Sequence, residues 1–333
     1  MNKINNIEYN VKSYDSTYGN TRLELNIKGD NIDYVILNTL RRAIMSYIPN
    51  YAFTEFNFKK NNTIFNNNYL KLRISNIPVW GIENNLEIFV PKKKSLIEET
   101  IYEEENINDD IDLNPETTNL NTSTLKQLTM YVDYKSNEKD VMTVTTDHAK
   151  FYYAEKKIDS PYKIPIPIVK LQPNQTITFS VITSVGIEQQ HAIYSVVGVC
   201  FYKQITENEF DFIVESRGLL TEKRIIHIAL INIIDKLKNI FKTISNNIDD
   251  KKLKGEIIIM HEDNTMGNLI SHGMQQHKDI SFVGYNLPHL LEDKVIIHYE
   301  LKKGGKLLDV LNSVTDYYKN LFNKILDKNK NIK

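Results

Sequence analysis

The sequence predicts an α+β fold made of two related modules on one chain, with a mostly β insert in the first module. Two long segments carry apolar residues at alternating intervals of three and four, which is typical of helices that pack along a seam. A strand–helix–strand pattern precedes each of them, and a strand-rich region separates the two halves. Because each apolar seam needs a partner, we expect the two long helices to pack against each other.

The composition restricts the class of protein. The 333 residues are 41% hydrophobic and 25% charged with a net charge of −1, which is ordinary for a globular protein and unlike a strongly basic nucleic-acid binder. The lone cysteine, Cys200, excludes an internal disulfide and any zinc site with two or more cysteines. No apolar signal core follows Met1 and no apolar run reaches about 18 residues, so we expect a soluble intracellular protein without a membrane segment.

The first module is expected at residues 1–66 and 203–249. Loose alternation over residues 7–29 predicts strands around a turn, and a short helix follows that Pro49 ends. The clearest helical pattern spans residues 219–248. The seam of that helix consists of Ile226, Leu230, Ile233, Leu237, Ile240 and Ile244.

The expected insert covers residues 67–202. Clean alternation over much of residues 127–215 predicts a mostly antiparallel sheet. Residues 95–124 differ, because an acidic stretch without basic residues leads into a Thr/Asn-rich run. That composition predicts a solvated acidic loop.

A short polar linker is expected at residues 250–254, followed by the second module at residues 255–333. The pattern there is strand, helix, two strands and a last helix from about residue 306. The seam of the last helix consists of Leu307, Leu311, Val314, Tyr318 and Leu321.

The two halves echo each other. Asn38-Thr39-Leu40 is expected to open the first short helix, and Asn264-Thr265-Met266 the corresponding helix of the second module. Each precedes a phenylalanine, Phe56 or Phe282, by the same interval. We interpret the echo as a pseudo-two-fold pair of modules, and the alternative is a coincidence between two common α+β units.

Motifs of catalysis are not evident. The sequence lacks a phosphate-binding P-loop, a dinucleotide-binding fingerprint and the His-Glu-x-x-His zinc motif. His261, Glu262 and Asp263 could help to bind a metal, but we favour a helix start at which Thr265 or Asn264 is the cap. Cys200 lies in an apolar strand and is interpreted as a small buried hydrophobe.

An acidic cluster in the expected loop is the one alternative catalytic feature. Asp109, Asp110 and Asp112 superficially resemble a magnesium-binding group. A low-complexity loop is a poor frame for a catalytic metal, so we predict no catalytic residues, no metal and no cofactor. Two modules with helical seams are instead typical of a scaffold.

Several motifs identify a family. Five segments, 38–55, 73–79, 168–175, 186–192 and 212–218, include Asn-x-Leu-Arg-Arg, Ile-Pro-x-Tyr-Ala-x-Thr-Glu and Phe-x-Val-Glu-Ser-x-Gly. They resemble the third-largest-subunit type of RNA polymerase, one of the α-like subunits.

The second module resembles the small α-like partner, the eleventh-subunit type. The matching segments are residues 261–269, 282–289 and 291–294. A fusion of both types in one chain resembles the arrangement in large cytoplasmic DNA viruses. Three departures stand out: the cysteine cluster that some relatives carry in the insert is missing, Asn50 replaces a glycine, and Pro288-His289-Leu290 lacks a second proline.

This resemblance implies a non-catalytic assembly subunit of a DNA-directed RNA polymerase, with an intramolecular pseudo-heterodimer as its platform. It implies the largest and second-largest subunits and a small zinc-binding subunit of the tenth-subunit type as partners, without direct nucleic-acid or membrane contact. If the protein is viral, we expect it in the virus factory of the host cytoplasm, and the sequence leaves open whether it is also packaged in the virion. The alternatives are a metal-dependent enzyme that uses the acidic cluster and a free-standing regulatory binding protein.

The resemblance also assigns residues. The implied subunit interface consists of Asn38, Arg41, Arg42, Glu55 and His191, with a solvated basic helix face as the alternative for the two arginines. The motif of the second module is expected to supply core, turn and interface positions. Its residues are Glu262, Asp263, Thr265, Gly267, Asn268, Gly284, Tyr285, Pro288, His289, Glu292 and Lys294.

Overall fold

The chain forms two compact units. The computed structural model describes residues 7–17, 20–82, 86, 127–137, 139–154, 156–245, 252–289, 292 and 294–331. Unit 1 contains Met1–Asn50, Asn84–Phe89 and Ile187–Lys333, and unit 2 contains Tyr51–Glu83 and Val90–Gly186. The acidic loop 95–124 and the first part of the linker 250–254 lie outside the described residues.

The first module of unit 1 is a four-stranded sheet covered by two helices. The strands lie in the order β1 (Glu8–Thr17), β2 (Asn20–Lys28), β11 (Glu209–Ser216) and β10 (Val197–Thr206), and every neighbouring pair is antiparallel. The short 3-10 helix η3 (Ala192–Tyr194) comes just before β10. The two helices are α1 (Tyr34–Ser46) and α3 (Glu222–Ser245).

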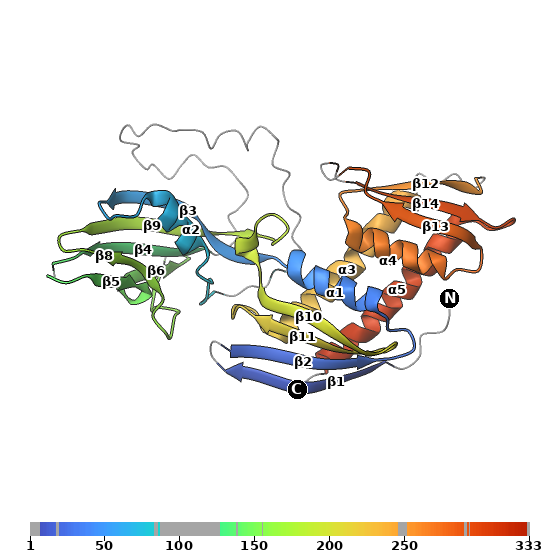
Figure 1. The fold of residues 1–333 in the computed structure, drawn as a ribbon, viewed down its shortest axis with the longest axis horizontal. Helices are drawn as coiled ribbons and strands as arrows, with labels where there is room; N and C mark the ends of the chain where they lie inside the picture. The colour runs from blue at the N-terminus through green and yellow to red at the C-terminus, as the bar shows by residue number, and fades with distance from the viewer. Residues whose placement is uncertain are drawn as a thin grey trace. The chain divides into compact units, whose positions relative to one another are not determined.

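The second module has the same plan with three strands. Its sheet has the order β12 (Lys254–Met260), β14 (Lys294–Leu301) and β13 (Ile280–Asn286), and again the pairs are antiparallel. Helix α4 (Asn264–Gln275) follows β12, and helix α5 (Leu307–Lys330) follows β14 (Figure 1).

The elements of the two modules correspond one to one. The series β2, α1, β10, β11, α3 matches the series β12, α4, β13, β14, α5, both along the chain and in the order of the strands within each sheet. The chain between α1 and β10 leaves the first module to build unit 2. The structure therefore contains the pair of related modules that the sequence predicts.

The predicted alignment of the two short helices, with Asn38 matched to Asn264, is wrong. Helix α1 begins at Tyr34 with Asp33 as its N-cap, not at Asn38, and α4 has Asp263 rather than Asn264 or Thr265 as its cap. A carboxylate accepts the free amides of a first helical turn, so aspartate competes well for this position. Counted from the two caps, Asn38 corresponds to Asn268.

The predicted helical seams are buried in one shared core. Helices α3 and α5 run side by side (Figure 1), and all eleven seam residues named above are at most 7% exposed. Buried apolar residues from both modules belong to a single hydrophobic cluster. None of the described helices is both long and apolar enough to cross a membrane.

The end of α5 reaches the first strand of the first module. The Tyr9 hydroxyl donates to Asn329 Oδ1 at 3.1 Å, and Asn329 Nδ2 donates to the carbonyl of Lys223 at 3.0 Å. Asn329 is only 3% exposed. This one amide therefore joins β1, α3 and α5 across the two modules.

Unit 2 is the β-rich insert. Its main sheet has the order β3 (Asn50–Asn61), β9 (Thr176–Gly186), β4 (Leu128–Lys135), β6 (Ala149–Tyr153) and β7 (Lys156–Ile158). Strands β5 (Met142–Thr145) and β8 (Pro167–Leu171) form a second, antiparallel pair. Helix α2 (Asn67–Ser75) contacts β8, and η2 (Thr146–His148) lies between β5 and β6.

The boundaries of the insert differ from the expected 67–202. The compact units divide at Asn50/Tyr51 and at Gly186/Ile187. The physical reason is strand pairing, because β3 is hydrogen-bonded to β9 within the insert, whereas β10 is hydrogen-bonded to β11 of the first module. Pairing partners far apart in sequence are not visible in a local pattern.

Candidate subunit interface

Helix α1 presents one polar face to solvent. Its other face is buried because apolar residues recur at helical spacing, and the Asp33 side chain starts the helix by accepting from the Ile36 amide at 3.0 Å. Tyr34 is 57% exposed and Met45 is 36% exposed. We call Tyr34, Asn38, Arg41 and Met45 the α1 stripe, since their spacing places them along one side of the helix.

Arg41 is held in place within the α1 stripe. Its Nε and Nη2 donate to Asn38 Oδ1 at 3.1 and 3.0 Å, and its Nη1 lies 3.2 Å from Met45 Sδ. These contacts fix the planar guanidinium along the helix surface, where it stays partly exposed. A positioned, permanently charged fork suits the binding of a carboxylate from outside.

Cys200 lies in β10, which packs against α1. Burial raises the pKa of its thiol to about 12, although the positive charge of Arg41 acts in the opposite direction. The residue as a whole is 9% exposed. The prediction of a small buried hydrophobe is therefore confirmed.

Arg42 points to the second module. Its Nε donates to Thr265 Oγ1 at 2.6 Å and its Nη2 donates to Asp263 Oδ2 at 3.0 Å. These partners lie at the start of α4. Arg42 thus has an intramolecular role that the resemblance does not assign to it.

Three further side chains complete this contact between the modules. The Tyr47 hydroxyl donates to Asp263 Oδ1 at 2.9 Å. Lys236 of α3 donates to both carboxylate oxygens of Glu262 at 2.9 and 3.0 Å, and its ammonium lies 4.5 Å from the centre of the Tyr47 ring. Burial alone would raise the pKa of the Asp263 carboxyl, but hydrogen bonds from Thr265 and Tyr47 and the charge of Arg42 hold it below its ordinary value.

The other expected interface residues lie apart from this contact. His191 is exposed, and its Nδ1 accepts from the Ile193 amide at 3.2 Å. Its loop touches the end of α1, since the Gln189 amide donates to the Ser46 carbonyl at 3.3 Å. Glu55 is exposed on β3 in unit 2. The structure therefore brings His191, but not Glu55, to the same unit as the α1 stripe.

The motif of the second module supplies a close helix–sheet contact and a turn. A side chain at Gly267 would clash, because a Cβ there would lie 2.7 Å from Val295 Cγ1 and 3.0 Å from the Tyr285 ring. Asn268 is half-buried on α4, and a Cβ at Gly284 would lie 3.5 Å from Phe282 Cζ, an ordinary contact.

After β13 the motif continues in an exposed turn. Pro288 and His289 are exposed, and the Glu292 amide donates to the His289 carbonyl at 3.1 Å. The Lys294 ammonium pairs with the Glu292 carboxylate at 2.6 Å. These residues lie between β13 and β14.

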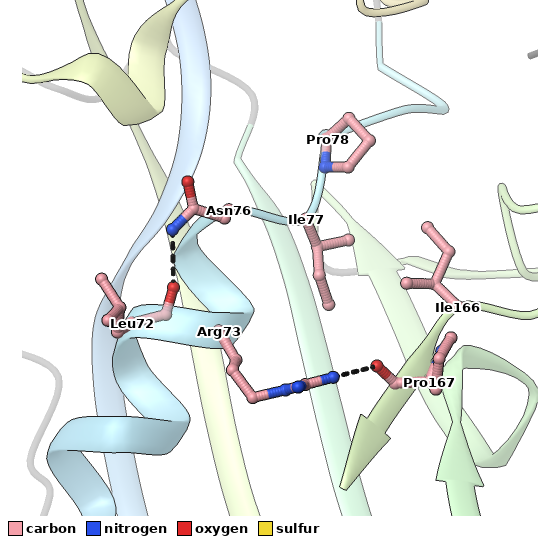
Figure 2. A pocket seen from close by; sticks show the side chains of 7 residues that line it. All are labelled: Leu72, Arg73, Asn76, Ile77, Pro78, Ile166 and Pro167. Atoms are coloured by element: carbon pink, nitrogen blue, oxygen red, sulfur yellow. Dashed lines mark hydrogen bonds between the residues drawn. The ribbon is translucent and has the colours of Figure 1, made fainter.

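Unit 2 holds a pocket of about 410 Å³ (Figure 2). The Arg73 guanidinium donates to the carbonyls of Pro167 and Ile168, and the Asn76 amide donates to Leu72, so both polar groups are bonded to backbone. The lining residues are Leu72, Arg73, Asn76, Ile77, Pro78, Ile166 and Pro167. The motif at residues 73–79 thus lines this pocket.

Among the described residues, no group of three or more His, Cys, Asp or Glu side chains lies close enough to hold a metal ion. Asp109, Asp110 and Asp112 lie outside the part of the chain that the structure describes. Glu262 and Asp263 are engaged by Lys236 and Arg42.

Sequence reasoning missed Tyr47 and Lys236. Tyr47 reads as one more apolar residue at a helix end, and Lys236 as one more polar residue beside the seam of α3. Only the fold shows that they meet Glu262 and Asp263, which come from the other module.

Comparison with known proteins agrees with this architecture. The model of the RNA polymerase Rpb3/Rpb11 dimerisation domain matches residues 27–237, and a second model of the same description matches residues 254–328. The chain belongs to the Rpb3/Rpb11 family. It is a fused α-like subunit of DNA-directed RNA polymerase, with one dimerisation domain in each module.

Relatives match both the whole chain and its parts. A putative DNA-directed RNA polymerase subunit of Acanthamoeba polyphaga mimivirus is 23% identical over 92% of this chain and 89% of its own length. A probable subunit of RNA polymerases I and III of Caenorhabditis elegans is 36% identical over 22% of this chain and 50% of its own length. An RNA polymerase subunit of Methanobrevibacter smithii is 30% identical over 24% of this chain and 31% of its own length.

Proposed function

We propose that this chain is a non-catalytic assembly subunit that nucleates the joining of the two large catalytic subunits of a DNA-directed RNA polymerase. The observation that carries the proposal is the single hydrophobic core shared by two dimerisation domains on one chain. Such a platform forms without a search for a separate partner, because a short linker sets an effective concentration of about millimolar.

The α1 stripe is the proposed docking site for the second-largest subunit. It combines exposed Tyr34 and Met45 with a positioned guanidinium at Arg41. Tyrosine and arginine are frequent anchors of protein interfaces, because they bury much area and bond with direction. Since Arg42 is bonded within the chain, the external contact is assigned to Arg41 rather than to both arginines.

The remaining partners are proposed from the family. His191, near the end of α1, extends the same surface, and Glu55 is the contact expected from unit 2. The largest subunit and a small zinc-binding subunit of the tenth-subunit type complete the proposed assembly. For a viral enzyme, we expect this assembly in the virus factory of the host cytoplasm.

The test is a tagged pull-down of the full chain from native or infected cells, with mass spectrometry and a ribonucleotide-incorporation assay. We expect both large subunits at one to one with the chain, and RNA synthesis by the complex. Arg41→Glu should leave the chain folded and lower capture of the second-largest subunit at least ~10-fold. Lys238→Glu, the same charge reversal at an exposed position of α3, is the matched control.

Two outcomes would contradict the proposal. Recovery of the chain alone, or with partners that make no RNA, would favour a free-standing regulatory protein of the same fold. Full capture by Arg41→Glu would remove the α1 stripe from the interface while leaving the assembly role in place.

A further inference from the structure

Two aspartates occupy equivalent places in the two modules. Asp33 caps α1, and its Oδ1 accepts from the Ile36 amide at 3.0 Å. Asp263 caps α4, and its Oδ1 accepts from the Thr265 amide at 2.7 Å. Because α1 and α4 correspond in the two modules, the caps are related by the pseudo-two-fold repeat.

The second oxygen of each cap faces a basic side chain of the other module. Asp263 Oδ2 lies 3.0 Å from Arg42 Nη2, and Asp33 Oδ2 lies 3.4 Å from His272 Nε2. Arg42 and His272 each lie nine positions after the cap of their own helix. The two contacts are therefore reciprocal, because the cap aspartate of each helix contacts the basic residue of the other helix.

The two contacts are unequal. Arg42 also bonds Thr265, and the Tyr47 hydroxyl donates to the same Asp263 carboxylate. An arginine keeps its charge at every pH of interest and binds with a planar fork.

The contact between Asp33 Oδ2 and His272 Nε2 is longer, and the histidine is charged only when it is protonated. The described residues give His272 two further polar contacts, both in its own module. Its Nδ1 lies 3.1 Å from the Tyr318 hydroxyl, and its Nε2 lies 3.3 Å from Gln276 Nε2.

We propose that these contacts are two unequal clasps that set the register in which the modules dock, and that Arg42 is the main positioning residue. The Asp263 clasp consists of Arg42, Tyr47, Asp263 and Thr265, and the Asp33 clasp consists of Asp33 and His272. The apolar packing of α3 against α5 has no direction of its own, whereas charge-assisted hydrogen bonds hold only at one alignment. The inference concerns the chain alone and does not depend on the proposed polymerase partners.

The experiment measures the affinity between the modules. A protease site is placed within residues 246–251 of the full chain, and the folded protein is cut so that its two parts can dissociate. Asp263→Asn and Asp33→Asn form a matched pair, because asparagine caps a helix as well as aspartate but carries no charge. We expect Asp263→Asn to raise the dissociation constant at least ~10-fold and Asp33→Asn to raise it less than ~3-fold.

Two further variants test the position of Arg42. Arg42→Gln should weaken docking about as much as Asp263→Asn, and the double variant should add little to either, because both remove the same contact. Arg41→Glu should leave the affinity unchanged. Equal effects of the two aspartate variants, or additive effects of Arg42→Gln and Asp263→Asn, would overturn the inference.

If the cut parts do not separate, amide hydrogen exchange in the uncut chain decides the question. Arg42→Gln should speed exchange in the first turn of α4 at least ~5-fold and leave the first turn of α1 unchanged. Unchanged exchange in α4 would show that Arg42 does not position that helix.

Discussion

The sheets of the two modules are alike on their inner faces, which are apolar, and differ on their outer faces. In the first module the outer face carries ion pairs between strands, Lys12 with Asp211 at 2.5 Å and Arg22 with Glu215 at 2.7 Å. In the second module Lys254 pairs with Glu300 at 2.9 Å on the corresponding face, and three apolar side chains there, Ile258, Met260 and Phe282, are each more than 50% exposed. The inner faces of both belong to one core.

This difference separates what the fold requires from what it leaves free. Both sheets need an apolar inner face, because the same pair of long helices packs between them. Neither sheet needs a particular outer face, so that face can change with the surroundings of each module. The first module also has β1 beside β2, whereas among the described strands β12 has only β14 as a neighbour.

The shared core should be the most sensitive part of both modules. Leu321→Ala on α5 removes a fully buried side chain at the seam, so we expect a loss of about 2–5 kcal/mol in the free energy of unfolding. Asn323→Ala, at an exposed position of the same helix, should change it by less than ~0.5 kcal/mol. Denaturant unfolding of both variants measures the difference, and equal effects would mean that the seam is not closed in solution.

The difference between the two outer faces can be tested with one isoleucine on each of them. Ile213 faces outward on β11, yet it is 1% exposed, and it lies between Glu24 and Phe201 in the strand register. Ile258 on β12 is 54% exposed. The same change to alanine should cost about 2–4 kcal/mol at Ile213 and less than ~0.5 kcal/mol at Ile258. Similar costs at the two positions would show that the outer faces are equally covered.

The smallest expected effect is a dependence on pH at the Asp263 clasp. The pKa of the Asp263 carboxyl is lowered in the folded chain, so its charge stabilises the fold above the unfolded value of roughly 3.9. This stabilisation is lost as the pH falls through the lowered folded value. The stability difference between the native chain and Asp263→Asn should therefore be full near pH 6 and shrink below about pH 4. A difference that stays constant down to pH 3 would contradict the charged contact.

The helical seams could be predicted from the sequence because they are local. Residues such as Ile233 and Leu311 repeat at intervals that only a helix brings to one side, and each pattern extends over several turns. The second module, which has no insertion, was therefore predicted in nearly its observed order of elements.

The caps, the insert boundary and the clasps depend on choices that a local pattern leaves open. The run from His261 to Thr265 offers several capping side chains in succession, and only the path of the chain selects Asp263. Likewise, nothing near Arg42 in the sequence distinguishes it from Arg41, because its partner is 221 positions away.

The hydrogen bond between Tyr9 and Asn329 has a consequence for the folding of the chain during its synthesis. The ribosome makes Asn329 only after it has added 320 residues beyond Tyr9, which takes about 15–60 seconds at ordinary rates of translation. Until α5 has been made, only α1 and α3 can cover the apolar side of the first sheet, and the shared core stays incomplete. A chain that terminates early lacks α5 and leaves part of the shared core uncovered, so we expect a protease to cut truncated products faster than the full chain.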